Sequence, residues 1–175
     1  KQYMDDFTGA VEDFTRCIAA HGEQVADSYY ARGQIKYHKM NDPAGAMEDY
    51  DKAIELKSDD ADFYRSRAIL LDDHAAIHDL TKAIGLDPAD PNTYVHRSLK
   101  MMSLQDYDAA ICDLTKVIEM GPANLEHMTL SEVFSMRGYV RMLLYDFPAA
   151  LHDADKAVEC DPTRASAFLD RGTIK

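Results

Sequence analysis

The chain has 175 residues, of which 46% are hydrophobic and 29% charged, and its formal net charge is −12. No apolar run approaches the roughly 18 to 20 residues that a membrane span needs, and no cluster of lysine and arginine suits a nucleic acid backbone. These features argue against a membrane-spanning protein and against a nucleic acid partner, and they favour a helical chain in the cytoplasm.

A unit of two helices accounts for most of the sequence pattern, and its clearest copy covers residues 91–124. Its first half places Tyr94, Ser98 and Met101 at helical spacing, so that a small residue lies among larger ones on one face. Its second half begins after a polar break at Gln105 and stops at Gly121. The pattern therefore predicts a helix, a tight turn, a second helix and a stop.

Copies of both halves recur along the chain. Second-helix segments begin at Ala10, Ala46, Ala76, Ala110 and Ala150. First-helix segments with an aromatic residue and a following small residue lie at 29–33, 63–68, 94–98, 134–138 and 168–172. Ala76 and Ala110 are 34 residues apart, and self-similarity at such a period is the signature of a helical repeat array.

This pattern resembles the tetratricopeptide repeat family, whose unit has 34 residues with aromatic, small and alanine positions and a closing proline. Pro88, Pro122 and Pro162 occupy the closing position. The resemblance implies an all-α fold, a right-handed superhelical solenoid of antiparallel helix pairs, with about four complete repeats and partial repeats at both ends.

In chain order, the pattern divides a single array into six segments. They are a partial repeat over 1–24, complete repeats over 25–60, 61–90, 91–124 and 125–164, and the start of a sixth over 165–175. We expect Lys1 to lie near the end of a first helix, and we expect further repeats or another domain in the parent protein.

Two repeats depart from the template. Repeat three lacks about one helical turn, which predicts that its first helix, Ala61 to Leu71, is the shortest complete one. Repeat five has six extra residues before Phe134, and we expect them to extend its first helix, with Asn124 as the N-cap.

An arginine precedes each small residue of the first helices, and an aspartate lies three residues after each second-helix alanine. The arginines are Arg32, Arg67, Arg97, Arg137 and Arg171, and the aspartates are Asp13, Asp49, Asp79, Asp113 and Asp153. An arginine at a helix contact needs a carboxylate partner, so we predict a structural arginine–aspartate ladder. Pairing with the arginine of the next repeat leaves no residue over, whereas pairing within a repeat leaves Asp13 and Arg171.

In the tetratricopeptide repeat family, the remaining face of the first helices lines a concave groove where a peptide or partner helix binds. Carried over to this sequence, the predicted groove residues are Tyr30, Gln34, Tyr37, His38, Arg65, Ile69, Val95, Leu99, Met102, Ser135, Tyr139 and Met142. The alternative for any one of them is packing between repeats. The asparagine that chaperone-binding members place before the arginine is absent at all five positions, so a carboxylate clamp is not expected here.

The residues that could carry chemistry form no recognisable site. His74 and His78 share a helix face at a metal-binding spacing, but the sequence has no HExxH motif and no obvious third ligand. Cys17, Cys112 and Cys160 show no CxxC spacing. We therefore expect no enzyme activity, no metal and no cofactor.

The sequence predicts a protein–protein interaction scaffold that binds a peptide or helix of another protein in its concave groove. The alternative is a regulatory or oligomerisation segment of a larger enzyme or multidomain protein, with self-association through the open ends of the array.

Overall fold

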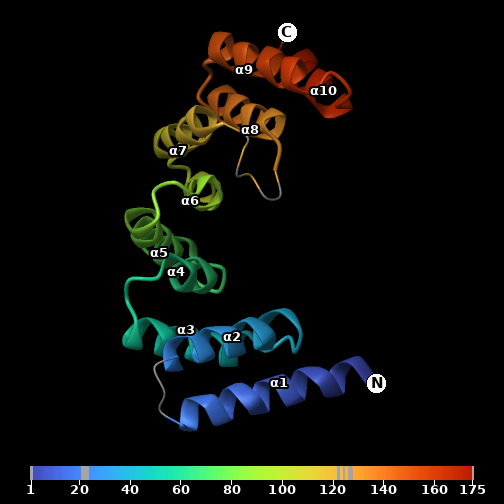
Figure 1. Cartoon of the computed structure of the whole chain (residues 1–175). Coiled ribbons are helices and arrows are strands. Elements are labelled where there is room, and N and C mark those ends of the chain that lie inside the picture. Colours follow the sequence, from blue (N-terminus) through green and yellow to red (C-terminus); the bar gives the residue numbers. More distant parts are fainter. Residues whose placement is uncertain (1, 21–23, 122, 124, 126–127, 175) are drawn as a thin grey trace. The chain divides into compact units, whose positions relative to one another are not determined.

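The structure is a computed structural model that describes residues 2–20, 24–121, 123, 125 and 128–174. Within this part of the chain there are ten α-helices and no strand, as the sequence predicts (Figure 1). The helices are α1 (Gln2–Ala19), α2 (Val25–His38), α3 (Pro43–Leu56), α4 (Ala61–Ala68), α5 (Asp73–Leu86), α6 (Pro91–Ser103), α7 (Tyr107–Met120), α8 (Leu130–Leu143), α9 (Phe147–Cys160) and α10 (Ala165–Ile174). None of these helices is long and apolar enough to cross a membrane.

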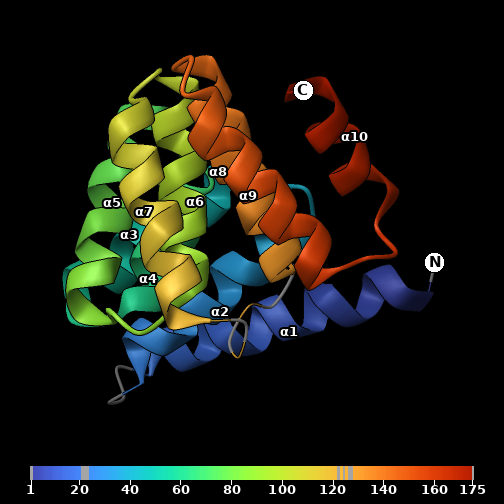
Figure 2. The same cartoon turned by 90° about the horizontal axis from the view of Figure 1, so that it is seen from above.

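The chain divides into two compact units, residues 1–86 and 87–175, whereas the sequence pattern predicts a single array. In the first unit, α2 packs on α3 and α4 packs on α5, while α1 contacts α2 and α3 contacts α4. In the second unit, α6 packs on α7 and α8 packs on α9 (Figure 2). Helix α10 contacts both α8 and α9. Each unit is therefore a stack of helix pairs that bury their apolar faces against their neighbours.

Aspartates begin most of the second helices. At the start of α3, the side chain of Asp42 accepts a hydrogen bond from the Gly45 N–H at 2.9 Å, which satisfies one of the free backbone donors of the first turn. Asp106 and Asp146 cap α7 and α9 in the same way. The residue before each of these three aspartates has a positive φ; these residues are Asn41, Gln105 and Tyr145. A left-handed residue followed by a capping aspartate thus makes the tight turn within each of these repeats.

Repeat three has a shorter first helix than the other repeats, as predicted. Helix α4 has 8 residues, whereas α2, α6 and α8 have 13 or 14. The helix ends at Ala68, three residues before the predicted end at Leu71. Asp72 then accepts hydrogen bonds from two backbone N–H groups at the start of α5.

The predicted extension of the first helix of repeat five is wrong. Helix α8 begins at Leu130, where Thr129 is the N-cap and forms a reciprocal capping box with Glu132. The extra residues precede this cap, and Asn124 lies outside the described residues. A threonine followed three residues later by a glutamate fixes the start of a helix, so the insertion stays in the connection.

The N-terminal segment forms one continuous helix, α1, from Gln2 to Ala19. Lys1, which is expected near the end of a first helix, lies outside the described residues. Neither glycine nor proline occurs among residues 2–6, so nothing in this segment stops a helix.

Small residues sit where the helices approach most closely. Ser98 is fully buried, as are the alanines Ala46, Ala76, Ala110 and Ala150 of the second helices. A Cβ added to Gly138 would lie 3.2 Å from the Cβ of Asp153 and 3.3 Å from the carbonyl oxygen of Ala150. The backbones of α8 and α9 can therefore approach this closely only because the residue has no side chain.

Candidate functional site

Four arginines of the first helices each form a two-point ion pair with an aspartate of the following second helix. In each pair, Nε and Nη2 donate to the two carboxylate oxygens, at 2.6 to 3.0 Å. The pairs are Arg32–Asp49, Arg67–Asp79, Arg97–Asp113 and Arg137–Asp153. For these four arginines, the pairing therefore runs within each repeat and differs from the predicted pairing with the arginine of the next repeat.

The two residues left over by this register find other partners. Arg171 donates to Asp155 of α9 at 3.3 Å, and Asp13 accepts from Arg16 on its own helix at 3.2 Å. Asp13 and Arg16 are both largely exposed, so this pair contributes little to stability.

The third guanidinium nitrogen reaches back to the preceding repeat, which the sequence analysis missed. Nη1 of Arg32 donates to Thr15 at 2.9 Å, and Nη1 of Arg67 donates to Asp51 at 2.8 Å. Arg137 makes the equivalent bond to Thr115 at 2.9 Å. The acceptors lie two residues after the ladder aspartate of the preceding repeat, and this regular spacing is the sequence signal that could have revealed them.

An aromatic ring lies beside each ladder arginine, three residues earlier in the sequence. The guanidinium carbons of Arg32, Arg67, Arg97, Arg137 and Arg171 lie 5.3 to 5.9 Å from the centres of these rings. Stacking of this kind orients the planar guanidinium toward its carboxylate. In four repeats, an aromatic ring, an arginine and an aspartate thus pack together.

Hydrogen bonds to aspartates favour the charged form of two ladder arginines. The bond with Asp49 raises the pKa of Arg32, and the bond with Asp113 raises the pKa of Arg97, although burial opposes both shifts. These two guanidinium groups therefore stay protonated at neutral pH.

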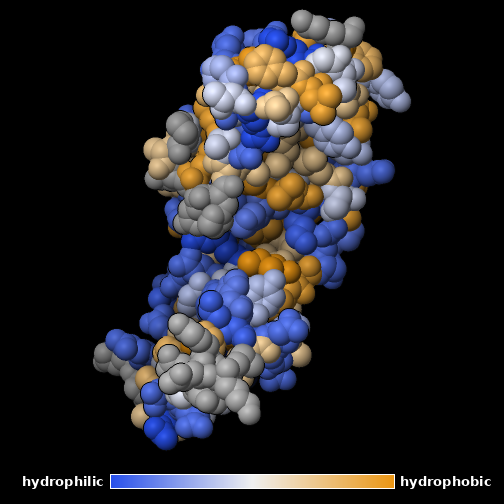
Figure 3. Space-filling view, turned by 90° about the vertical axis from the view of Figure 1, so that its right-hand side faces the viewer, coloured by the Kyte–Doolittle hydropathy of each residue, from blue (hydrophilic) through white to orange (hydrophobic). Residues whose placement is uncertain are grey.

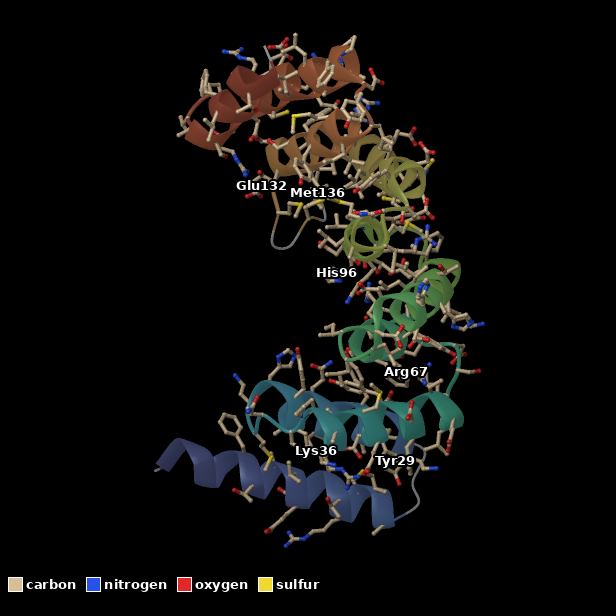
Figure 4. All side chains as sticks on the ribbon, turned by 180° about the vertical axis from the view of Figure 1, so that it is seen from behind. Tyr29, Lys36, Arg67, His96, Glu132 and Met136 are labelled. Atoms are coloured by element: carbon tan, nitrogen blue, oxygen red, sulfur yellow. The ribbon has the colours of Figure 1, made fainter. Side chains whose placement is uncertain are left out.

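A second cation joins the aspartate in two of the repeats. Lys36, one turn after Arg32, places Nζ 2.9 Å from Asp49. Arg141 in α8 places Nη1 2.8 Å from Asp153, whose side chain is fully buried. Figure 4 shows Lys36 on α2 and Arg67 between α4 and the neighbouring α3.

The groove residues predicted on α2 are partly used in packing between repeats. Gln34 donates to the hydroxyl of Ser66 in α4 at 2.7 Å, and Ser66 donates to the hydroxyl of Tyr30 at 3.2 Å. The ring of Tyr30 also packs on Phe63, with 4.8 Å between the ring centres. Tyr30 and Gln34 therefore hold α2 against α4.

The other predicted groove residues of the first unit are more accessible. Tyr37 and the exposed His38 meet edge to face, with 4.8 Å between the ring centres. Arg65 forms an ion pair with Asp62 on its own helix, and Ile69 is exposed just after α4 ends. None of these four side chains lines either of the two pockets described below.

In the second unit, the predicted residues of α6 and α8 differ in their surroundings. Val95 is 5% exposed and belongs to the core, whereas Leu99 is exposed and Met102 half-buried. Ser135, Tyr139 and Met142 of α8 meet residues of α10 around a small pocket, which we call the C-terminal pocket. Its lining is Ser135, Gly138, Tyr139, Met142, Ala154, Asp170, Thr173 and Ile174.

The C-terminal pocket combines apolar walls with several hydrogen-bonding groups. Its volume is about 30 Å³, room for one or two water molecules or a methyl group. The Oγ of Ser135 is buried, and among the described residues it has no hydrogen-bond partner. Tyr139 is 51% exposed at the rim, and Asp170 adds a carboxylate. Figure 3 shows hydrophobic side chains at the surface of this unit, in the upper part of the view.

A larger and more open pocket lies in the first unit, among α3, α4 and α5; we call it the Arg67 pocket. Its volume is about 460 Å³. The lining consists of Met47, Asp51, Arg67, Leu71, Ala75, His78 and Asp79. The sequence analysis did not identify this site, because its residues come from three helices and the α4–α5 connection.

The histidines and cysteines do not assemble a metal site. His74 and His78 are both exposed, and His78 lies 3.6 Å from a carboxylate oxygen of Asp79. In the part of the chain that the structure describes, no three residues of the histidine, cysteine, aspartate and glutamate types are grouped so as to hold a metal ion. Cys17, Cys112 and Cys160 are free and exposed.

Comparisons with known proteins bear on the fold. A family model described as tetratricopeptide repeat matches residues 26–60. No curated protein matches the sequence. A crystal structure of MamA has a TM-score of 0.79 with 21% identity, and the match covers 95% of each chain.

Two further solved structures have the same fold. MamA from Desulfovibrio magneticus RS-1 has a TM-score of 0.74 and 17% identity over 87% of this chain and 84% of its own. YrrB, described as a TPR protein with an unusual peptide-binding site, has a TM-score of 0.79 and 18% identity over 98% of this chain and 86% of its own. At these identities the similarity concerns the fold alone. The chain therefore contains a tetratricopeptide repeat, and its all-α solenoid fold is that of the tetratricopeptide repeat family.

Proposed function

We propose that the protein is an interaction scaffold that binds an extended peptide or a helix of a partner protein across the exposed faces of α8 and α10. The observation that carries this proposal is the C-terminal pocket. Three residues that the sequence assigns to the groove, Ser135, Tyr139 and Met142, line it together with α10.

The chemistry of the C-terminal pocket suits a peptide. The unpaired hydroxyl of Ser135 and the carboxylate of Asp170 can accept hydrogen bonds from backbone N–H groups. Met142 and Ile174 provide an apolar wall, and the small volume selects a short side chain. An aromatic residue that is half exposed at the rim, such as Tyr139, is typical of residues that dominate binding energy at interfaces.

The fold supports the same proposal by analogy. Tetratricopeptide repeat arrays serve as protein-binding scaffolds in general, and a peptide-binding site is named for YrrB. A fold alone does not assign a function, so the proposal depends on the pocket residues.

Selection from a random dodecapeptide library displayed on phage, with the full chain as bait, tests the proposal. We expect Tyr139→Ala to lower the affinity of the selected peptides by at least about tenfold, because the substitution removes the aromatic ring at the rim of the pocket. Tyr145→Ala is the matched control, since Tyr145 is an exposed tyrosine in the α8–α9 turn outside the pocket. Equal loss in both variants, or no loss in Tyr139→Ala, would overturn the proposal.

Self-association is a second candidate function, favoured by the apolar surface of α10. Phe168 and Leu169 are both exposed on this last helix. If they join copies of the chain, light scattering after gel filtration will show a mass that rises with concentration, and Leu169→Glu will restore the monomer mass. A monomer mass at all concentrations would reject this candidate.

A further inference from the structure

The charge around the ladder arginines differs between repeats. Around Arg32 and around Arg137, two cations face one carboxylate, because Lys36 and Arg141 join Asp49 and Asp153. The residue that receives Nη1 from the preceding repeat is a neutral threonine in both cases. Each of these clusters has a net charge of +1.

The cluster around Arg67 has the opposite balance. Arg67 faces two carboxylates, Asp79 of α5 and Asp51 of α3. The only other basic group within 4.0 Å of these carboxylates, among the described residues, is the imidazole of His78, which lies 3.6 Å from Asp79. Counted over Arg67, Asp51 and Asp79, the cluster has a formal net charge of −1, two charges more negative than its counterparts.

The position of the second cation holds an apolar residue in repeat three. Lys36 and Arg141 each lie four residues after the ladder arginine, on the next turn of the same helix. The equivalent residue in repeat three is Leu71, which comes after the end of α4 and packs against Ala68, Ala76 and Leu80. Leu71 also lines the Arg67 pocket, so the pocket has no cation of this chain at that position.

We propose that the Arg67 pocket binds a lysine or arginine side chain of a partner protein, which supplies the second cation. The carboxylate of Asp51 is reachable from outside, since its side chain is 48% exposed, whereas Asp79 is 2% exposed and forms the inner end. Met47, Leu71 and Ala75 line the pocket beside these charges. An apolar wall next to a carboxylate suits a long side chain with a hydrocarbon stem and a cationic end.

This site is separate from the proposed peptide site. It is built by α3, α4 and α5, whereas the C-terminal pocket is built by α8, α9 and α10. Failure of one proposal therefore leaves the other unaffected.

Two pentapeptides serve as probes, acetyl-Ala-Leu-Lys-Leu-Ala-amide and the same peptide with glutamine in place of lysine. Each is titrated to millimolar concentration into the full chain labelled with ¹³C at the methionine methyl groups. We expect the lysine peptide to shift the Met47 methyl signal in a saturable way, and we expect the glutamine peptide to leave it unchanged. A Met47 signal that does not shift, or that shifts equally with both peptides, would overturn the proposal.

The variant Asp51→Thr separates specific binding from general attraction to an acidic protein. Threonine occupies this position in the clusters of Arg32 and Arg137 and keeps the bond to Nη1, so the fold should be retained. We expect the dissociation constant of the lysine peptide to be about fivefold higher for this variant than for the unchanged chain.

The matched control is Asp155→Thr. Asp155 lies at the equivalent position of α9 and accepts a hydrogen bond from Arg171, and its replacement by threonine changes the net charge by the same amount. We expect this variant to bind the lysine peptide within about twofold of the unchanged chain. An equal loss of affinity in both variants would show that only net charge matters and would reject the proposal.

Discussion

The helix pair α4–α5 in the first unit and the pair α8–α9 in the second unit are joined by the same arginine–aspartate contact, but with different lengths of helix. Helix α4 has 8 residues and α8 has 14. Both place the arginine next to the closest helix approach, so the contact between Nε, Nη2 and the carboxylate is the same in both pairs. In α8, Arg141 adds a second cation to Asp153, whereas Arg67 of α4 has no such neighbour and an open pocket lies beside it. The ladder contact therefore forms even in a helix of two turns.

Removing the aspartate of the longer pair should have the largest effect. Asp153→Ala leaves Arg137 and Arg141 without their carboxylate in a buried position, and we expect a loss of about 3 to 5 kcal/mol in the free energy of unfolding. Urea denaturation followed by circular dichroism measures this loss. Asp155→Ala on the same helix is the control, since its half-exposed side chain should contribute less than about 1 kcal/mol. Equal losses of unfolding free energy in the two variants would show that burial of the carboxylate does not increase its contribution to stability.

Adding a side chain between α8 and α9, beside this contact, should have the next largest effect on stability. Gly138→Leu forces a side chain against Asp153 and the backbone of Ala150, and we expect a loss of about 1 to 3 kcal/mol in the free energy of unfolding. Gly172 holds the equivalent position in α10, where a Cβ would meet nothing within 4 Å. Gly172→Leu should therefore be neutral or stabilising in the same urea experiment, and a loss there as large as at Gly138 would contradict the packing explanation.

The second cation can be removed without removing the ladder contact. Arg141→Leu gives repeat five the residue that repeat three has at this place, and Asp153 keeps its two bonds to Arg137. We expect the free energy of unfolding to fall by about 1 kcal/mol, because one charged hydrogen bond at a partly exposed side chain is lost. Thermal denaturation of Arg141→Leu beside Arg141→Lys measures this effect, with the lysine variant expected to retain most of the stability. Equal melting of both variants would mean that the second cation has no stabilising role.

The smallest effect concerns the cap of α8 and depends on pH. Hydrogen bonds from the Thr129 backbone and side chain, together with Arg164, lower the pKa of Glu132. A carboxylate with a lowered pKa in the folded state stabilises the fold above its unfolded pKa of about 4.5, and this contribution is lost as the pH falls through the lower folded value. Glu132→Gln should therefore lower the melting temperature at pH 7, by the equivalent of less than about 1 kcal/mol, and should narrow its difference from the unchanged chain at acidic pH. A difference in melting temperature that grows as the pH falls would contradict this prediction.

Much of the fold could be predicted because the repeat period fixes which residues face a neighbouring helix. The positions of Ser98, Gly138 and the ladder residues follow from this period alone. The extra residues of repeat five were assigned to a helix although Thr129 and Glu132 carry a capping signature. In that segment, local capping chemistry decided the outcome and the absence of proline did not.

The candidate sites were harder to predict, because periodicity identifies a face but not what covers it. Tyr30 lies on the predicted groove face, yet Ser66, 36 residues later, binds it in the folded chain. The partner of each ladder arginine likewise depends on how the two helices of a repeat close on each other, which spacing along the sequence does not specify. The residues of the Arg67 pocket come from three helices and a connection, and the repeat pattern does not identify them as neighbours.

The hydrogen bonds donated by Nη1 also affect the cooperativity of unfolding. The guanidinium of Arg137 in α8 donates both to Thr115 of α7 and to Asp153 of α9, so unfolding of either neighbour removes one of its hydrogen-bond partners. Fraying that starts at one helix should therefore spread to its nearest neighbour instead of stopping there, which makes each stack behave as a cooperative folding unit larger than a single repeat.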